Sequence, residues 1–286
     1  METFSEKNFG LDLVRATEAA ALAAGPWAGR GDPAGADGDA ARAMRRILNT
    51  MHMDGKIVIG EEGRHQNEPD LLGSGEKVGD GSLPAVDIVV DPVEGIRLLS
   101  EGLYETISVA GIAPAGSMRS LAPAAYMEKL VVSHEVASVI GIKCLDAPAG
   151  WTLGLVAKAK EKPVSALTVF VLNRPRHQEL ITEIREAGAR ILLRPDGDVA
   201  GALMAATPRS GVDVLMGIGG IPEGVITACA VKALGGVILG RLAPQNNEER
   251  EAALDAGLDM NQVFTGDEMV ASDDVFFAAT GVTDGG

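Results

Sequence analysis

The sequence predicts an α/β protein, and this prediction rests on composition, on short apolar strand-like runs, and on their alternation with helical patterns. The chain has 286 residues, of which 46% are hydrophobic, so it can bury a sizeable core. Glycine occurs 36 times and aromatic residues make up only 3%, a composition typical of α/β enzymes whose short elements are joined by tight turns. The length fits one large domain or two fused subdomains.

The first half of the chain is predicted to begin with two helices. Apolar residues at helical spacing predict the first over residues 11–24, ending at Gly25 and Pro26. The Gly-rich residues 29–38 are predicted to form a loop, and residues 39–51 a second helix. Asp37 lies at the entrance of that helix, where it is either an N-cap carboxylate or a functional group. Strands are predicted over residues 56–60, 85–90, 108–113 and 128–132, with a polar, turn-rich segment over residues 62–83.

The second half alternates strands with helices more regularly. Strands are predicted over residues 166–172, 190–193, 212–218 and 275–279, and helices over residues 178–187, 199–206 and 225–234. Such alternation of apolar strands with helices indicates α/β layering around a mostly buried sheet. A Gly/Pro/Lys-rich stretch near residues 147–162 suggests a boundary, which divides the chain into subdomains 1–150 and 151–286.

Charge and motif content exclude several classes of function. The chain has 40 acidic and 25 basic residues, giving a formal charge of −15, which argues against nucleic acid or an anionic membrane as partner. No nucleotide-binding P-loop and no Gly-x-Ser-x-Gly nucleophile elbow is present. The two cysteines lack metal-type spacing and are expected to be reduced. We find neither a signal peptide nor an apolar stretch of about 20 residues, so a cytoplasmic location is expected.

Acidic residues follow several predicted strands. Asp91 and Glu94 lie in Asp-Pro-Val-Glu-Gly after one apolar run, Glu61 follows another, Asp37 lies in the Gly-rich stretch, and Glu223 follows Gly-Ile-Gly-Gly-Ile-Pro. Any one of them is more simply explained as a solvated turn. Together they resemble a set of hard oxygen ligands for Mg²⁺ or Mn²⁺. A phosphatase needs such a set, because divalent metals neutralise the phosphate and activate water.

Other polar residues near strand ends are candidates for contacts with a phosphorylated sugar. Each of them also has a simpler explanation as a solvated turn or a half-buried ring. They are Arg174, Arg176, Asp196, Asp198, Tyr126 and Lys129.

An ordered series of motifs resembles the class II fructose-1,6-bisphosphatases, a bacterial branch of the lithium-sensitive, metal-dependent phosphatase superfamily. The resemblance covers nearly the whole chain. Its landmarks are GRGDPAGADG, DGKIVIGEE, GEKVG, AVDIVVDPVEG, AYMEKL, RPRH, RPDGDVA, DVLMGIGGIPEG and ATGVTDG. It implies a five-layered αβαβα sugar phosphatase fold, a role in carbohydrate metabolism, and hydrolysis of the 1-phosphate of a ketose bisphosphate.

The resemblance also implies a role for each matching residue. Residues 1–150 become the metal-binding subdomain, and residues 151–286 complete the sugar-phosphate site. The implied Mg²⁺ or Mn²⁺ ligands are Asp37, Glu61, Asp91, Glu94 and Glu223, of which Glu61, Asp91 and Glu94 are catalytic. The implied substrate contacts are Glu94, Gly95, Ile96, Tyr126, Arg174, Arg176, Asp196, Asp198 and Gly220. The resemblance further suggests a homodimer or homotetramer.

Four departures from the family pattern affect these expectations. Ile96 replaces a threonine whose hydroxyl helps to position the attacking water, and Pro33 replaces a lysine. Gly60-Glu61-Glu62-Gly63 stands where Gly-Glu-Gly-Glu is usual, with two extra residues following it, and the chain ends before the family's usual C-terminal segment. We therefore expect a slow bisphosphatase or a paralogue that acts on another sugar phosphate. A non-catalytic sugar-phosphate-binding protein is the third alternative.

Overall fold

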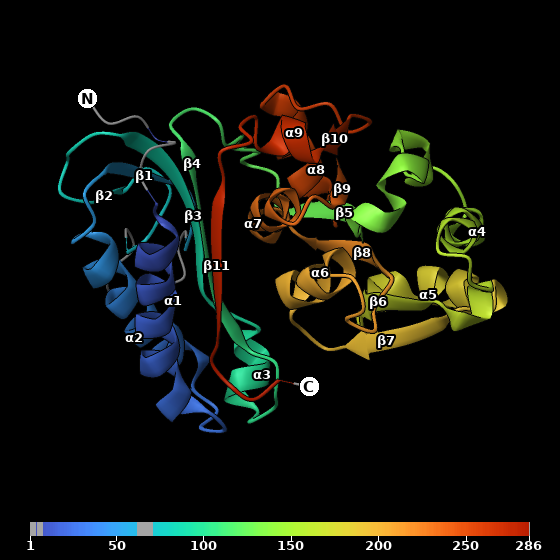
Figure 1. Cartoon of the computed structure of the whole chain (residues 1–286), viewed down its shortest axis with the longest axis horizontal. Helices are drawn as coiled ribbons and strands as arrows, with labels where there is room; N and C mark the ends of the chain where they lie inside the picture. Colours follow the sequence, from blue (N-terminus) through green and yellow to red (C-terminus); the bar gives the residue numbers. More distant parts are fainter. Residues whose placement is uncertain (1–3, 5–7, 62–70, 286) are drawn as a thin grey trace. The chain divides into compact units, whose positions relative to one another are not determined.

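The computed structural model describes Phe4, residues 8–61 and residues 71–285, and it divides into two compact units (Figure 1). Unit 1 consists of residues 1–120 and 270–286, and unit 2 of residues 121–269. The sequence predicts a different division, at residue 150. The difference has a physical reason: the last strand of the chain pairs within unit 1, so unit 1 is built from two separate stretches of sequence.

Unit 1 is a mixed five-stranded sheet whose order is β11-β4-β3-β1-β2. The strands are β1 (Asp54–Ile59), β2 (Lys77–Val78), β3 (Ala85–Glu94), β4 (Ile107–Pro114) and β11 (Phe276–Gly281), and the helices are α1 (Gly10–Ala24), α2 (Pro33–Leu48) and α3 (Ile96–Ser100). Helices α1 and α2 lie against one face of this sheet (Figure 1). The core between them contains Leu13 of α1, Met44 of α2 and Ile88 of β3, all fully buried.

Helix α2 begins earlier than its sequence pattern predicts. Asp32 is the N-cap, because its side chain accepts a hydrogen bond from the backbone N–H of Gly35 at 2.9 Å. Pro33 occupies the first helical position, where its fixed φ is favourable and its missing N–H costs nothing. The predicted loop therefore ends at residue 32, and Asp37 is not the N-cap but a buried residue of the second helical turn.

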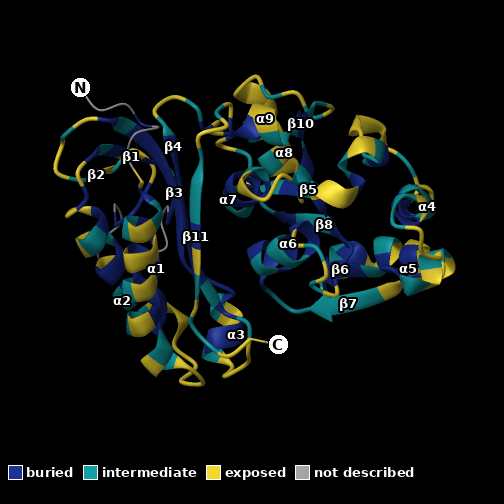
Figure 2. Ribbon diagram, viewed as in Figure 1, coloured by how far each residue is buried: buried dark blue, intermediate teal, exposed yellow. Residues whose placement is uncertain are grey.

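Strand β3 continues through a segment that the sequence predicts to be a sharp turn. The prediction ends the strand at residue 90, because Pro92 cannot donate a backbone hydrogen bond. In the structure β3 extends to Glu94 and pairs with β4, with an irregularity in register between Asp91 and Glu94. Nearly all of β3 is buried (Figure 2), so it is the central strand of unit 1.

Unit 2 is a mixed six-stranded sheet whose order is β10-β9-β5-β8-β6-β7. The strands are β5 (Tyr126–Val132), β6 (Thr168–Leu172), β7 (Arg190–Arg194), β8 (Val214–Gly220), β9 (Val237–Leu242) and β10 (Val263–Thr265). The helices are α4 (Ala149–Ala159), α5 (Gln178–Glu186), α6 (Asp198–Ala206), α7 (Ile221–Ala233), α8 (Asn247–Asp255) and α9 (Gly266–Met269).

Helices cover both faces of the unit 2 sheet. Successive residues of a strand point to opposite faces, so the side chains of one strand pack against helices on both sides. Val169 and Val171 of β6 lie in the core shared with α4 and α5. Phe170, between them, packs on α6, where a Cβ added to Gly201 would come within 2.4 Å of its ring. Unit 2 is thus a layered α/β body, and the predicted α/β class is confirmed for both units.

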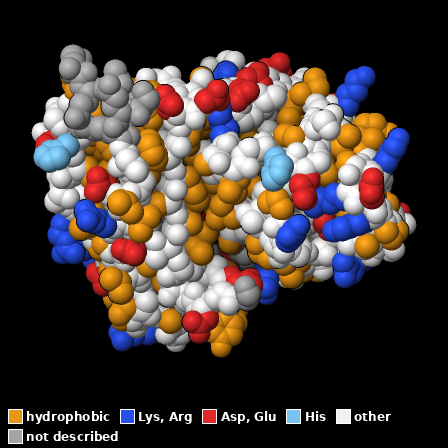
Figure 3. All heavy atoms as spheres, viewed as in Figure 1, with side chains coloured by type: hydrophobic (Ala, Val, Ile, Leu, Met, Phe, Trp, Pro, Cys, Tyr) orange, Lys and Arg blue, Asp and Glu red, His pale blue; other side chains and the backbone are white. Residues whose placement is uncertain are grey.

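Most predicted elements are present within a few residues of their expected bounds. The predictions missed α3, α4, α8, α9, β2, β9 and β10, and the segment expected to be a boundary near residues 147–162 contains α4. The predicted turn-rich segment begins with residues 62–70, which lie outside the described residues. Among the described helices, none combines the length and apolarity that a bilayer crossing requires. On the face shown in Figure 3, the Lys and Arg side chains lie in several separate groups, with Asp and Glu side chains between them.

Candidate functional site

Four of the predicted metal ligands are buried carboxylates of unit 1. Asp37, Glu61, Asp91 and Glu94 are at most 6% exposed to solvent. Glu61 lies two residues after the end of β1, and Asp91 lies in the last part of β3. Because β1 and β3 are parallel neighbours, their carboxyl ends lie at the same edge of the sheet, which is where α/β folds usually bind ligands.

A bulge in β3 brings two of these carboxylates together. Residues 91 and 94 of a regular strand would point to opposite faces. Here Asp91 is opposite Val109 and Glu94 is opposite Ile107, so β3 advances three residues while β4 advances two. This extra residue restores a common side, and carboxylate oxygens of Asp91 and Glu94 lie within 4.8 Å of one another. The backbone N–H of Val93 donates to Asp91 Oδ1 at 3.1 Å.

The donor set of unit 1 fits a divalent cation. A buried carboxylate is costly unless it is compensated, and neighbouring carboxylates repel each other. Carboxylate oxygens are also the hard ligands that Mg²⁺ and Mn²⁺ prefer. Two carboxylates in close approach, at the same sheet edge as a buried third, are the arrangement that such an ion would stabilise.

The turn after β3 is fixed by glycine. Gly95 directly precedes α3 and has a φ of +85°. This is a left-handed backbone conformation that residues other than glycine adopt only at a cost in free energy. Ile96 is the first residue of that helix, and its side chain packs against the core of unit 1. This core contact explains an apolar residue at position 96 that the sequence alone left unexplained.

Three of the predicted substrate contacts, Glu94, Gly95 and Ile96, belong to unit 1, and the other six belong to unit 2, at one edge of its sheet. Arg174 and Arg176 follow β6, Asp196 follows β7, and Gly220 ends β8. Strands β7 and β8 both run parallel to β6, so these residues share the carboxyl edge. Tyr126 begins β5, which is antiparallel to β8 and pairs Tyr126 with Gly220, so it lies at the same edge.

A buried ion pair joins this edge to the first turn of α6. The ammonium group of Lys129 forms a short ion pair with Asp198 and donates to the carbonyl of Gly220 at 3.2 Å. Lys129 is 2% exposed and Asp198 is 8% exposed. A charged pair this deeply buried fixes the end of β8 against α6 in one arrangement.

Two glycines allow charged groups to approach the end of β8 closely. A Cβ at position 219 would lie 1.9 Å from Asp198 Oδ2 and 2.8 Å from Lys129 Nζ. A Cβ at Gly220 would lie 1.9 Å from Oε2 of Glu223. Glu223 lies in the first turn of α7. This Glu223 oxygen is buried and has no hydrogen-bond partner among the described residues, so it is an acceptor that a ligand could use.

Arg176 and His177 hold the peptide of Ile218. The Arg176 guanidinium donates to the Ile218 carbonyl from Nε at 3.2 Å and from Nη2 at 2.8 Å, and it stacks 5.2 Å from the ring centroid of Tyr126. Burial lowers the pKa of Arg176. The Ile218 N–H donates to His177 Nε2 at 2.7 Å, and His177 Nδ1 lies 2.7 Å from the Leu172 carbonyl.

These contacts require a neutral His177. Nε2 accepts a hydrogen bond, so the ring proton is on Nδ1 and is donated to Leu172. Burial lowers the pKa of His177, which favours this neutral form. The sequence analysis did not select His177, because a histidine without a neighbouring metal-type ligand gives no signal. Its role depends on the fold that places it beside β8.

Arg174 and Asp196 pair with each other. Arg174 Nη2 lies 3.2 Å from Asp196 Oδ1, and both side chains are partly exposed. The pair links the loops after β6 and β7. A guanidinium oriented by a carboxylate is a suitable partner for a second anionic group.

The sequence is similar to proteins of one known family. The profile of the family described as bacterial fructose-1,6-bisphosphatase, glpX-encoded, matches residues 7–286. The class 2 fructose-1,6-bisphosphatase of Haemophilus influenzae is 44% identical over 291 residues, covering 96% of this chain and 85% of the relative. Fructose-1,6-bisphosphatase 1 class 2 of Escherichia coli K12 is 41% identical over 292 residues, covering 98% and 85%. Both alignments extend through both units.

Proposed function

The chain belongs to the bacterial class 2 fructose-1,6-bisphosphatase family, and from this premise we propose which residues carry the activity. The protein is a phosphoric monoester hydrolase that acts on fructose 1,6-bisphosphate. The observation that supports the residue assignments is the set of four buried carboxylates in unit 1, of which Asp91 and Glu94 are in close approach.

We propose that Asp37, Glu61, Asp91 and Glu94, together with Glu223, hold divalent cations of the Mg²⁺ or Mn²⁺ type. When bound, such cations neutralise the charge of a phosphate and make water a stronger nucleophile. Asp91 and Glu94 are proposed as the central ligands because the β3 bulge directs both to one side. The assignment of Glu223 follows from the family motif and from its buried, unused oxygen.

Glu61 is proposed to accept the proton of the attacking water. Glu61 follows β1 at the edge of the sheet where the neighbouring parallel strand β3 also ends, and this supports the role, since a general base must lie near the proton that it removes. The water oxygen then bonds to phosphorus while the bond from phosphorus to the C1 oxygen breaks. The leaving C1 oxygen takes up a proton from solvent and Glu61 releases its proton to solvent, giving a sugar monophosphate and inorganic phosphate.

The remaining residues are proposed to hold the substrate. Gly95 and Ile96 adjoin the carboxylates, and the carboxyl edge of unit 2 would contact the sugar and its second phosphate through Tyr126, Arg174, Arg176, Asp196, Asp198 and Gly220. Of the two arginines, Arg174 is the better candidate to bind the second phosphate, because Arg176 already donates to the carbonyl of Ile218. The family also suggests a homodimer or homotetramer in the cytoplasm, which light scattering and cell fractionation would test.

A second candidate function is hydrolysis of a different sugar phosphate. It is favoured by Ile96, which has no hydroxyl to position water at a point where the family has one. Losing one positioning group costs about 10²–10³ in rate by analogy with single oxyanion donors. A protein retuned to another substrate would tolerate that loss, whereas an efficient fructose bisphosphatase would not.

The test is phosphate release from a panel of sugar phosphates with Mg²⁺ or Mn²⁺, with the remaining sugar phosphate identified. We expect release from fructose 1,6-bisphosphate to give fructose 6-phosphate, with activity abolished by a chelator and restored by metal. A clear preference for another sugar phosphate would favour the second candidate. Saturable binding without turnover of any substrate would instead favour a non-catalytic binding protein.

A further inference from the structure

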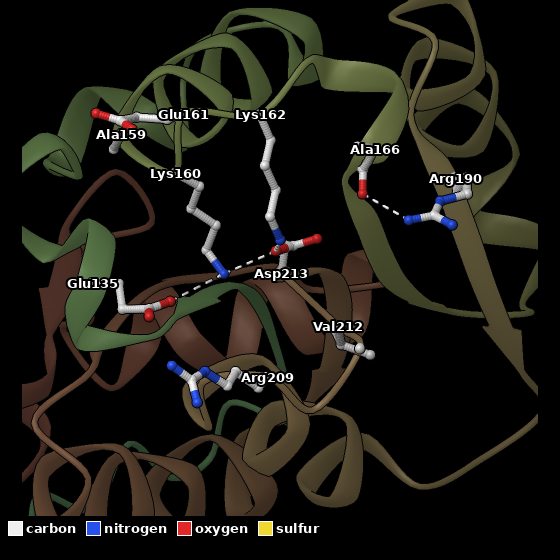
Figure 4. Close-up of a pocket in the computed structure, with 11 residues that line it drawn as sticks. Glu135, Ala159, Lys160, Glu161, Lys162, Ala166, Arg190, Arg209, Val212 and Asp213 are labelled. Carbon is white, nitrogen blue, oxygen red and sulfur yellow. Dashed lines mark hydrogen bonds and ion pairs between the residues drawn. The ribbon is translucent and has the colours of Figure 1, made fainter.

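Unit 2 contains a cavity that the proposed function does not use. It has a volume of about 550 Å³ (Figure 4), within the range of roughly 300–1,000 Å³ that is common for small-molecule sites. Its charged lining includes four cationic side chains, from Lys160, Lys162, Arg190 and Arg209. Such a group is notable in a chain whose formal charge is −15.

This basic pocket lies at the opposite edge of the sheet from the proposed substrate residues. Arg190 is the first residue of β7, Asp213 immediately precedes β8, and Ala166 lies just before β6. Arg174, Asp196 and Gly220 lie at the other ends of the same three parallel strands. A five-residue strand spans roughly 17 Å, so the two sites are separated by the length of the sheet.

The two lysines of the pocket are held by acidic partners. Lys160 Nζ lies 2.8 Å from Asp213 Oδ1 and 3.5 Å from Glu135 Oε2, and Lys162 Nζ lies 3.5 Å from the same Asp213 oxygen. The Lys160 side chain is 8% exposed. Asp213 also accepts from the Thr168 backbone N–H at 2.9 Å, which attaches it to the start of β6. The result is a rigid floor in which two lysines and two carboxylates balance.

The two arginines are not balanced in this way. Arg190 Nη2 donates to the carbonyl of Ala166 at 2.7 Å, a neutral acceptor that leaves its charge in place. Arg209 has no hydrogen bond or ion pair within the described part of the chain. The third acidic residue of the lining, Glu161, points away from the cavity in Figure 4. The interior of the pocket therefore has an excess of positive charge.

Arg209 is also held in a costly backbone conformation. Its φ is +65°, in the left-handed region that non-glycine residues adopt at a cost of about 1 kcal/mol or more. Neighbouring Ser210 fixes this turn by donating to the Met204 carbonyl at 2.6 Å. In Figure 4 the Arg209 guanidinium extends from the side opposite the two lysines and lies below Lys160 and Glu135.

We propose that the basic pocket binds the phosphate group of a small molecule, either inorganic phosphate or a phosphate ester. Arg209 provides a planar fork that matches phosphate oxygens, and Lys160 and Lys162 add ammonium donors from the other side. Arg190 contributes positive charge at the rim. A doubly negative phosphate neutralises the excess charge of the two arginines, which a neutral sugar or a cation does not.

The test is calorimetric titration of the full-length protein with inorganic phosphate and, separately, with glycerol 2-phosphate. A chelator is present throughout, so that metal-dependent binding at the substrate residues is suppressed. We expect saturable binding by the native protein and a Kd at least tenfold weaker in Arg209→Ala. Arg209→Gly suits the left-handed backbone, so it is expected to lose binding equally while unfolding at the same or a higher temperature.

Two matched controls locate the binding. Arg250→Ala removes an exposed arginine on α8, and Arg174→Ala removes a proposed substrate contact; neither is expected to change the Kd. Stronger binding of one ligand than the other identifies inorganic phosphate or an ester as the preferred source. Absence of saturable binding to either ligand would overturn the proposal, as would binding that Arg174→Ala abolishes and Arg209→Gly leaves intact.

Discussion

Removing the buried ammonium group of Lys129 should strongly destabilise unit 2. In Lys129→Met a side chain of similar length remains, but Asp198 loses its ion-pair partner while only 10% of its side chain is exposed. Breaking one partner of a buried pair costs about 3–5 kcal/mol. At pH 7 the loss has an upper limit near 4 kcal/mol, because protonating an ordinary aspartate instead costs about 1.4 kcal/mol per pH unit above its usual pKa. The expected loss is therefore about 3–4 kcal/mol.

The assay is urea denaturation of native protein, Lys129→Met, Asp198→Asn and the double variant. Since the penalty comes from an uncompensated carboxylate, the double variant should recover about 2 kcal/mol or more relative to Lys129→Met. Lowering the pH from 7 to 6 should also reduce the deficit of Lys129→Met by about 1 kcal/mol. A deficit below about 1 kcal/mol, or additive losses in the double variant, would refute the reasoning.

Three further results are expected. Ile96→Thr should lower the free energy of unfolding by about 1 kcal/mol in urea titrations, because Ile96 packs against the unit 1 core. The same substitution should raise the rate of phosphate release. An unchanged rate would mean that no hydroxyl is needed at position 96. Gly220→Ala should reduce phosphate release at least 100-fold, because its Cβ would lie 1.9 Å from Glu223 Oε2, whereas Gly154→Ala, with open space around it, serves as the harmless control. Burial lowers the pKa of His177, so the unfolded chain binds its proton more readily, and stability should fall as pH drops below about 6.5. His177→Gln should flatten that dependence in thermal unfolding, and an equally steep profile in both proteins would contradict it.

The fold class could be predicted from local patterns, because apolar runs such as that of β3 and the helical spacing of α1 are encoded within a few neighbouring residues. Division into units could not be predicted this way. Strand β11 pairs with β4 from far along the chain, and sequence order gives no indication of that pairing. Helix α4 was missed because glycine, proline and lysine around it are also typical of linkers, while burial of Leu153 and Val156 stabilises it as a helix.

The candidate site was predictable where a residue type carries its own chemistry. Carboxylates after apolar strands predicted metal ligands, and the structure buries three of them, Glu61, Asp91 and Glu94. The contribution of glycine was less visible, since Gly219 and Gly220 are explained only by the charged atoms that their missing Cβ atoms admit. His177 and the bulge after Asp91 depend on contacts across the sheet, so no local pattern could reveal them.

The most direct test of the central claim is Mn²⁺ binding measured by electron paramagnetic resonance together with phosphate release from fructose 1,6-bisphosphate. The comparison is between the native protein, Asp91→Asn, and Asp87→Asn, a control in the same strand whose carboxylate accepts from the Met118 N–H at 3.0 Å. The account predicts that Asp91→Asn loses at least 90% of both bound Mn²⁺ and activity at concentrations that saturate the native protein, while Asp87→Asn retains both. If Asp91→Asn, correctly folded, binds Mn²⁺ and hydrolyses the substrate like the native protein, the carboxylates of unit 1 are not the metal site.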